Sequence, residues 1–154
     1  MDNALSSSSF NLVSVDRGLA FFTSYRNKGE AVQAPELFTR AWDECIELQV
    51  MDKEAWVANT LSRLAQFDWR FEIGMHNGTH TVGGIILAAD EDIHVGPCLS
   101  VFAQYVLPEY RNRGVSMRCM RLAEQAAKDL GYKVLAYTHR MGDWRYSTTY
   151  RRLP

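Results

Sequence analysis

The residues with the clearest chemical potential form a short basic loop at 111–116, which reads RNRGVS. The loop lies between an apolar run at 100–107 and an apolar-periodic run at 117–130, so it is expected to join a strand to a helix. The first N–H groups of a helix lack partners within it, and the helix dipole adds roughly half a positive charge there. Gly114 lets an oxygen approach the backbone closely, and Ser116 is small. The loop therefore indicates a phosphate-binding site.

Two common phosphate-binding loops do not match this stretch. The G-x-x-x-x-G-K-[ST] spacing of a Walker loop is absent, and a single glycine does not make a dinucleotide fingerprint. An ordinary helix N-terminus would also fit the R-x-x-G-x-S spacing, so the loop alone leaves both interpretations open.

The wider stretch 106–116 resembles motif A of the GNAT superfamily of CoA-dependent N-acyltransferases. It reads VLPEYRNRGVS against the family pattern V-x-P-E-Y-R-x-x-G-x-[GA], with Ser116 as a departure in the last place. The family also carries an asparagine after the next strand and a tyrosine seven residues later. Asp143 and Tyr150 stand at that spacing. The resemblance covers roughly residues 70–154.

The resemblance implies that acetyl-CoA is bound as a cosubstrate. The pantetheine arm would pair with the backbone of 104–106 like an added strand, and the pyrophosphate would sit on the amides of 112–117. The cofactor-binding residues implied in this way are Gln104, Tyr105, Val106, Arg111, Asn112, Arg113, Gly114, Val115, Ser116, Met117 and Asp143. No metal is expected, because the histidines and cysteines show no metal-ligand spacing.

Catalysis is predicted to use a tyrosine near the C-terminus. The resemblance assigns Tyr150 as the general acid that protonates the leaving thiolate, and Tyr146 is the alternative; a packing role would also explain Tyr150. The general base is not evident from the sequence. Glu72 is one candidate, and a water relay would make a base unnecessary. The other candidates, each of which also fits a plain surface residue, are Asp90, Glu91, Asp92 and His94.

The predicted function is an acyl-CoA-dependent N-acetyltransferase that passes an acetyl group from acetyl-CoA to a primary amine by direct aminolysis of the thioester. The acceptor, whether a small molecule or a protein, is open. The alternative is a catalytically inactive GNAT-fold module that binds CoA or a protein partner. A nucleotide- or phosphate-binding module unrelated to CoA is a third interpretation.

Composition predicts a soluble, globular protein. The 154 residues are 47% hydrophobic and 23% charged, which predicts a single acyltransferase-like domain over 1–154 with a flexible stretch at 1–9. A net charge of −1 argues against a nucleic-acid partner. No signal peptide is expected, because residues 1–10 lack a basic stretch, and no apolar run approaches the ~20 residues that a membrane span needs. The odd, unpaired cysteines Cys45, Cys98 and Cys119 are predicted to be buried thiols. These features together predict a cytoplasmic protein.

The elements predicted from patterning give a mixed α+β fold. It resembles the GNAT fold: a mostly antiparallel twisted sheet with one βαβ unit and flanking helices is expected, without the two strands with which the family usually ends. That shortfall would leave an open sheet edge for a homodimer partner or the N-terminal segment to cover. Strands are expected at 10–15, 69–75, 81–89, 99–107 and 133–138, and an apolar segment of ambiguous period lies at 19–25. Helices are expected at 37–48, after Asp52, at 117–130 with Gly131 as its C-terminal stop, and at 143–153.

Turns and charges complete the pattern. Asn77-Gly78 predicts a hairpin turn, and residues 90–92 a turn or loop. Acidic residues gather in the first helical region, where either a solvated helix face or an amine-attracting rim would explain them. They are Asp43, Glu44, Glu47, Asp52 and Glu54.

Overall fold

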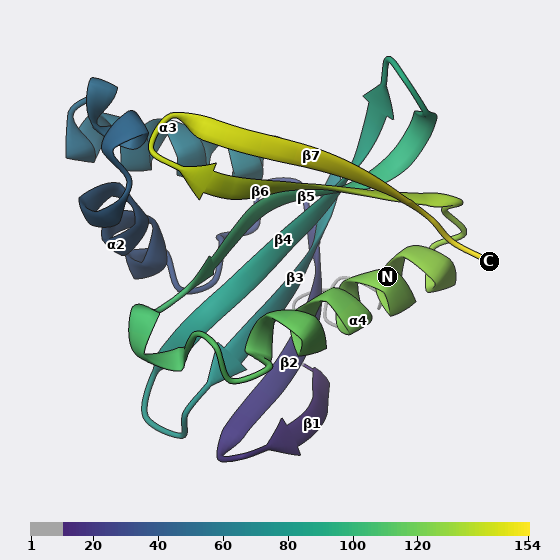
Figure 1. Cartoon of the computed structure of the whole chain (residues 1–154), viewed down its shortest axis with the longest axis horizontal. Coiled ribbons are helices and arrows are strands. Elements are labelled where there is room, and N and C mark those ends of the chain that lie inside the picture. Colours follow the sequence, from purple (N-terminus) through teal and green to yellow (C-terminus); the bar gives the residue numbers. More distant parts are fainter. Residues whose placement is uncertain (1–10) are drawn as a thin grey trace.

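The computed structural model describes residues 11–154, and its centre is a seven-stranded sheet whose strands lie in chain order (Figure 1). The strands are β1 (Asn11–Asp16), β2 (Leu19–Asn27), β3 (Trp69–His76), β4 (Thr81–Asp92), β5 (Gly96–Val106), β6 (Val134–Gly142) and β7 (Arg145–Arg152). Among the strands of residues 11–154, only β5 and β6 pair in parallel, and the other neighbours are antiparallel. This sheet confirms the predicted fold class. The expectations for residues 1–9 and for Phe10 lie outside the described residues.

Three helical segments follow β2: α2 (Glu36–Glu44), the 3₁₀ helix η1 (Ile46–Val50) and α3 (Lys53–Ala65). As predicted, Asp52 caps α3, because its Oδ2 accepts a hydrogen bond from the N–H of Ala55 (3.3 Å). The first helix does not run to residue 48 as expected. Cys45 has an extended backbone (φ −106°, ψ 108°) and turns the chain from α2 into η1. Residues 44–47 are named the α2–η1 corner.

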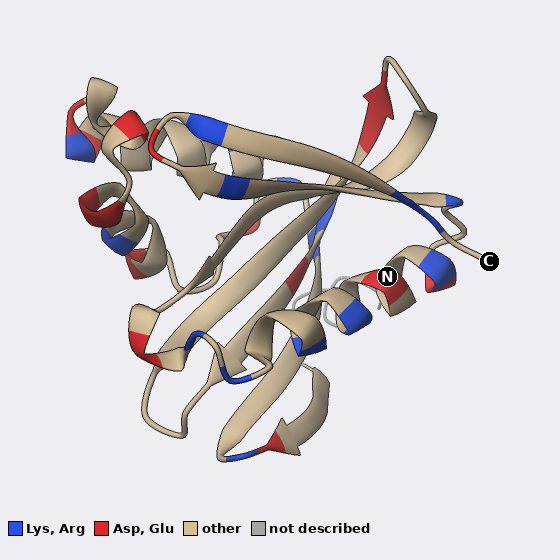
Figure 2. Cartoon of the chain, viewed as in Figure 1, with Lys and Arg blue, Asp and Glu red and all other residues tan. Residues whose placement is uncertain are grey.

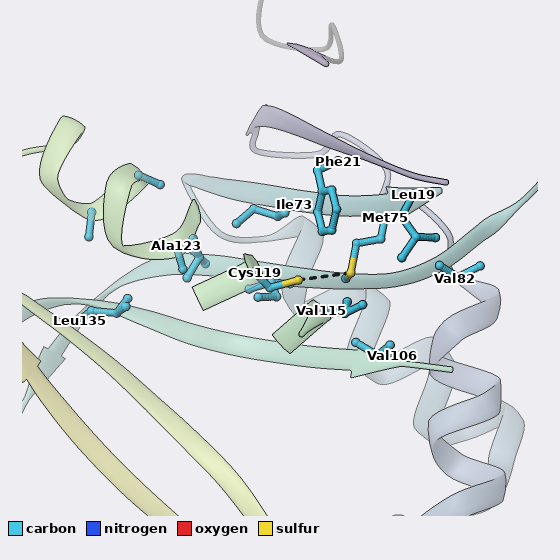
Figure 3. Packing of buried hydrophobic residues seen from close by; sticks show 14 of the residues in the cluster. Leu19, Phe21, Ile73, Met75, Val82, Val106, Val115, Cys119, Ala123 and Leu135 are labelled. Atoms are coloured by element: carbon cyan, nitrogen blue, oxygen red, sulfur yellow. Dashed lines mark hydrogen bonds between the residues drawn. The ribbon is translucent and has the colours of Figure 1, made fainter. Parts of the chain in front are cut away.

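Helix α4 (Val115–Asp129) connects β5 to β6 and makes the predicted βαβ unit, after the short 3₁₀ helix η2 (Pro108–Tyr110). Helices cover both faces of the sheet. Successive side chains of β4 point to opposite faces, and apolar ones are buried on each face. Ile85 packs in the cluster of α4, where the Cys119 thiol donates to the Met75 sulfur at 3.2 Å (Figure 3). Ile86 packs in a second cluster with Leu64 of α3. The two clusters fix α4 and α3 on opposite sides of the central strands.

Two predicted turns are confirmed. Gly131 ends α4 in the left-handed region (φ +84°), and its N–H donates to the carbonyl of Lys128 at 3.0 Å. Asn77 and Gly78 turn the chain between β3 and β4, where Asn77 Oδ1 accepts a hydrogen bond from the N–H of His80 at 2.9 Å.

The predicted helix at 143–153 is wrong, because this segment is strand β7. Tyr146 and Tyr150, four residues apart, share one face of a helix, but an even spacing also places them on one face of a strand. The β-branched pair Thr148 and Thr149 favours the strand, as does antiparallel pairing along β6. One of the strands thought to be lacking is therefore present, directly after β6.

Other boundaries move by a few residues. Residues 90–92 are not a turn, because they pair with 96–98 and extend β4. β6 continues to Gly142, beyond the predicted 133–138. The three cysteines are free and buried, as predicted. In residues 11–154, helices long and apolar enough to cross a membrane are absent.

Candidate cofactor and active site

The loop before α4 has the conformation that its glycine predicts. Gly114 is the N-cap of α4 with a left-handed backbone (φ +75°), and Asn112 also has a positive φ (60°). Among the described residues, no side chain caps α4, and its first turn carries no acidic residue. Basic positions instead mark the loop and α4 (Figure 2). A Cβ placed on Gly114 would have no described atom within 4 Å, so the space before the helix is open to an anion.

The sheet splits where this helix begins. β5 and β6 pair over only two rungs, Leu99 with Leu135 and Ser100 with Ala136, and then diverge (Figure 1). Residues 101–106 therefore have no β6 partner. The β4–β5 register also shifts here and leaves Phe102 as an extra, bulged residue. Bulges re-aim backbone groups next to active sites. This break in pairing, named the β5–β6 split, leaves the β5 backbone available to an added strand-like ligand.

A first ion-pair cluster joins the α2–η1 corner to the end of β5. Arg111 pairs through two nitrogens with the carboxylate of Glu44 (2.5 and 2.7 Å), and its Nε donates to the carbonyl of Val106 (2.8 Å). The Tyr105 hydroxyl donates to the same carboxylate at 2.7 Å. The bond from Arg111 holds the pKa of Glu44 below its usual value, and burial together with Glu44 raises the pKa of Tyr105 to about 12. The guanidinium of Arg111, a residue expected to help bind the cofactor, is thus paired with Glu44.

A second cluster joins the corner to β6 and β7. Arg140 pairs with Glu47 through Nε (2.5 Å) and Nη2 (2.9 Å). The Tyr146 hydroxyl and the N–H of Trp144 (3.3 Å) donate to the same carboxylate. The Arg140 bonds lower the pKa of Glu47, while burial and Glu47 raise the pKa of Tyr146 to about 12. The exposed side chain of Asp143 accepts one bond from Arg140 at 2.8 Å.

Tyr150 lies at the closed end of the β5–β6 split. It pairs with Ala136, which forms the last rung between β6 and β5. Its hydroxyl donates to Asp92 Oδ2 at 2.9 Å and lies 3.2 Å from His94 Nδ1. The bond to Asp92, and then burial, raise the pKa of Tyr150. The hydroxyl is therefore protonated at neutral pH and has a histidine that is largely exposed to solvent beside it.

The family comparison agrees with this geometry. A model described as "Acetyltransferase (GNAT) family" matches residues 35–144. The chain belongs to the GNAT family. No curated protein matches the chain.

Solved GNAT-fold structures resemble it at low sequence identity. They include PaiA N-acetyltransferase from Thermoplasma acidophilum in complex with coenzyme A (13% identity, TM-score 0.55, covering 79% of this chain and 82% of that one). A ribosomal-protein-alanine N-acetyltransferase from Brucella melitensis has 12% identity and a TM-score of 0.53, covering 77% and 80%. An aminoglycoside acetyltransferase from an uncultured soil metagenomic sample has 13% identity and a TM-score of 0.55, covering 79% and 81%. At this level of identity they support the fold.

Glu72, one candidate for the general base of this GNAT chain, lies in a buried ion pair. Its side chain is 6% exposed. One carboxylate oxygen accepts from Nε of Arg70 at 2.8 Å, and the other accepts from the N–H of Gln33 at 3.0 Å. Arg70 also donates to the carbonyls of Glu30 (2.5 Å) and Leu64 (3.3 Å). This geometry ties β3 to the start and end of the helical region and leaves Glu72 little access to a substrate.

The structure brings most of the predicted CoA residues together around the split and the α4 N-terminus. Within this group, Val115 is buried in the core and offers only its backbone, whereas Asn112, Arg113, Ser116 and Met117 are exposed. Gln104 is exposed on β5, and Asp143 lies apart in the β6–β7 turn.

Sequence reasoning missed the roles of Glu44, Glu47 and Arg140. Their ion-pair partners are 67 and 93 residues away, so local spacing carries no signal for them.

Two hollows lie elsewhere on the described surface. One of about 700 Å³ is lined by Lys133, Arg152, Leu153 and Pro154, and one of about 280 Å³ by Gln66, Phe67, Asp68, Trp69, Ala88 and Ala89. Neither touches the loop before α4. We therefore locate the candidate phosphate site from the geometry of the α4 N-terminus and not from the hollows, because a helix N-terminus binds phosphate without an enclosed pocket.

Proposed function

We propose that this GNAT protein transfers an acetyl group from acetyl-CoA to a primary amine. The observation that carries the proposal is the open, left-handed Gly114 cap of α4 beside the β5–β6 split. The pyrophosphate would rest on the first amides of α4, and the pantetheine arm would run along the unpaired side of 101–106. Basic positions in the loop add to the attraction for phosphate.

The proposed reaction is direct aminolysis. The amine nitrogen attacks the thioester carbonyl carbon, and a backbone N–H near Val106 stabilises the oxygen as it gains negative charge. The C–S bond then breaks, and the electron pair leaves with the sulfur. Tyr150 gives its proton to this thiolate and recovers one from water through His94, to which it lies within hydrogen-bonding distance.

The amine must also lose a proton. Proton removal through Glu72 would require the ion pair with Arg70 to open, so we assign this step to water in the split. The same observation favours the second candidate function, a GNAT-fold module that binds CoA without catalysis, because a positioned base is not evident among the described residues.

The acceptor is left as an unspecified primary amine. Similar proteins are named for aminoglycosides and for a ribosomal-protein alanine, so they do not agree on one acceptor. Both acetyl-CoA and CoA should bind in calorimetry while ATP binds more weakly, because ATP has no pantetheine arm to pair with β5. Release of CoA thiol with members of an amine panel or a host-cell extract would establish catalysis. CoA binding without thiol release would support the inactive module, and absence of CoA binding would refute both.

A further inference from the structure

The β6–β7 hairpin projects from the body of the protein with little hydrophobic support. No side chain from Tyr137 to Arg152 is buried. β6 leaves β5 after Ala136, and β7 pairs only with β6 among the described strands. The outer part of the hairpin, residues 138–149, therefore depends on polar contacts for its position.

One carboxylate makes these contacts at the open end of the split. Glu47 accepts two hydrogen bonds from Arg140 on β6, one from the N–H of Trp144 in the turn and one from the hydroxyl of Tyr146 on β7. Its side chain is only 8% exposed. Four donors from three parts of a hairpin converge on one residue, and bonds to an ionised, shielded carboxylate are the strong kind.

The corner that carries Glu47 also holds the opposite side of the split. Three residues earlier, Glu44 binds Arg111 and Tyr105 at the end of β5. One turn of chain thus contacts both sides of the split. Glu44 binds Tyr105 on β5 and Arg111 in the loop after η2, and Glu47 binds Arg140 on β6 and Tyr146 on β7. In the described residues, the other polar ties of the hairpin to the body, Tyr150 to Asp92 and His94 and Arg151 to Glu124, lie at the closed end.

We propose that Glu47 is a positioning residue that sets the separation of β5 and β6, and thereby the width of the split in which the thioester and the attacking amine meet. The inference rests on the proposed function, because it assumes that acetyl-CoA lies in the split. It assigns Glu47 no contact with substrate. Glu47 acts through the hairpin, by way of its hydrogen bonds to Arg140 and Tyr146.

The structure predicts which kinetic quantity changes. The pyrophosphate site at α4 is built from a different element, so loss of Glu47 leaves CoA affinity within about threefold. Turnover of bound acetyl-CoA falls about 10- to 100-fold, as expected when reacting groups are misplaced by about 1 Å. Glu47→Gln is the sharpest change, since it keeps the shape and removes the charge and one acceptor oxygen.

Glu124→Gln is the matched control. It removes another carboxylate that pairs with an arginine of the same hairpin, Arg151, but at the closed end, where β5–β6 pairing holds the strands. CoA affinity is measured by calorimetry, and thiol release from saturating acetyl-CoA is measured with a working amine. Amide hydrogen exchange is read separately for residues 138–149 and for α4.

The proposal expects faster exchange in 138–149 and lower turnover for Glu47→Gln, with both unchanged for Glu124→Gln. Adding Tyr146→Phe to Glu47→Gln should lower turnover no further, because both act through one contact. Normal turnover in a folded Glu47→Gln protein would overturn the inference, as would equal losses in the Glu124→Gln control. If the unchanged protein binds no CoA, the proposed function fails instead, and the exchange data alone still decide whether Glu47 holds the hairpin.

Discussion

Introducing a negative charge at position 114 provides the most direct test of the phosphate site. We compare Gly114→Glu with Gly114→Gln, two side chains of nearly equal shape. Both must adopt φ near +75°, which costs a non-glycine residue about 1–2 kcal/mol, and neither meets a described atom within 4 Å at Cβ. Their stabilities should therefore fall together, by about 2–8 °C in Tm. Any difference in CoA binding then reports the added negative charge.

The expected difference is large. The Glu carboxylate would lie at the α4 N-terminus, compete for the same amides as the pyrophosphate and repel it. Lost or unpaired hydrogen bonds to charged groups cost at least about 2 kcal/mol, which corresponds to roughly 30-fold in Kd. Calorimetry with CoA measures this directly, and thermal melts confirm folding. A folded Gly114→Glu protein that binds CoA as tightly as Gly114→Gln would refute the phosphate assignment.

Four further predictions follow from particular contacts. Tyr150→Phe should lower turnover about 10- to 1000-fold with CoA affinity nearly intact, since general acids contribute on the order of 10² to 10⁴; unchanged thiol release would leave Tyr150 a packing residue. Glu72→Gln should destabilise the fold by about 3–5 kcal/mol in urea unfolding, because it leaves Arg70 buried without its charge partner; a stable variant with an altered pH–rate profile would instead restore Glu72 as the base. Stability should decline as pH falls below about 4.5, because Glu44 and Glu47 have lowered pKa values when folded and must take up protons to unfold; acid melts of Glu47→Gln should show a shallower decline, and an identical one would contradict the pairing. The outer side of β7 is unpaired among residues 11–154, so we expect a dimer by light scattering at micromolar concentration, and a strict monomer would exclude a partner subunit at that edge.

The parts of the fold that the sequence predicted correctly are those determined by residues close together in the chain. Gly114 and Gly131 mark the ends of α4 because each occupies a left-handed backbone position next to an apolar-periodic run. Asn77 marks the β3–β4 hairpin because its side chain bonds its own turn. The phosphate loop belongs to this class as well: a helix end, a glycine and basic residues are contiguous, so the chemistry is visible before the fold is known.

Segment 143–153 shows where local reasoning failed. Its tyrosines recur at a spacing that helix and strand share, and the deciding fact was the partner strand β6, which pairing supplies and periodicity does not. The turn predicted at 90–92 was wrong for the same reason. Three consecutive acidic residues favour a turn locally, but here they pair with β5. Tertiary pairing overrides local preference most easily in strands, whose propensity depends on context.

The acidic run in the first helical region shows what the structure adds to function. Sequence could describe these residues only as a solvated face or an amine-attracting rim. In the structure, Asp43 pairs with Lys53, Glu44 with Arg111 and Glu47 with Arg140. The latter two ion pairs hold the corner against the two sides of the split, through Arg111 after β5 and Arg140 on β6. With these three carboxylates paired, less negative charge is left in this region to attract a polycationic acceptor. Under the proposed acetyl transfer, we therefore expect the acceptor to be selected more by the shape that Glu44 and Glu47 impose on the β5–β6 split than by the net charge around it.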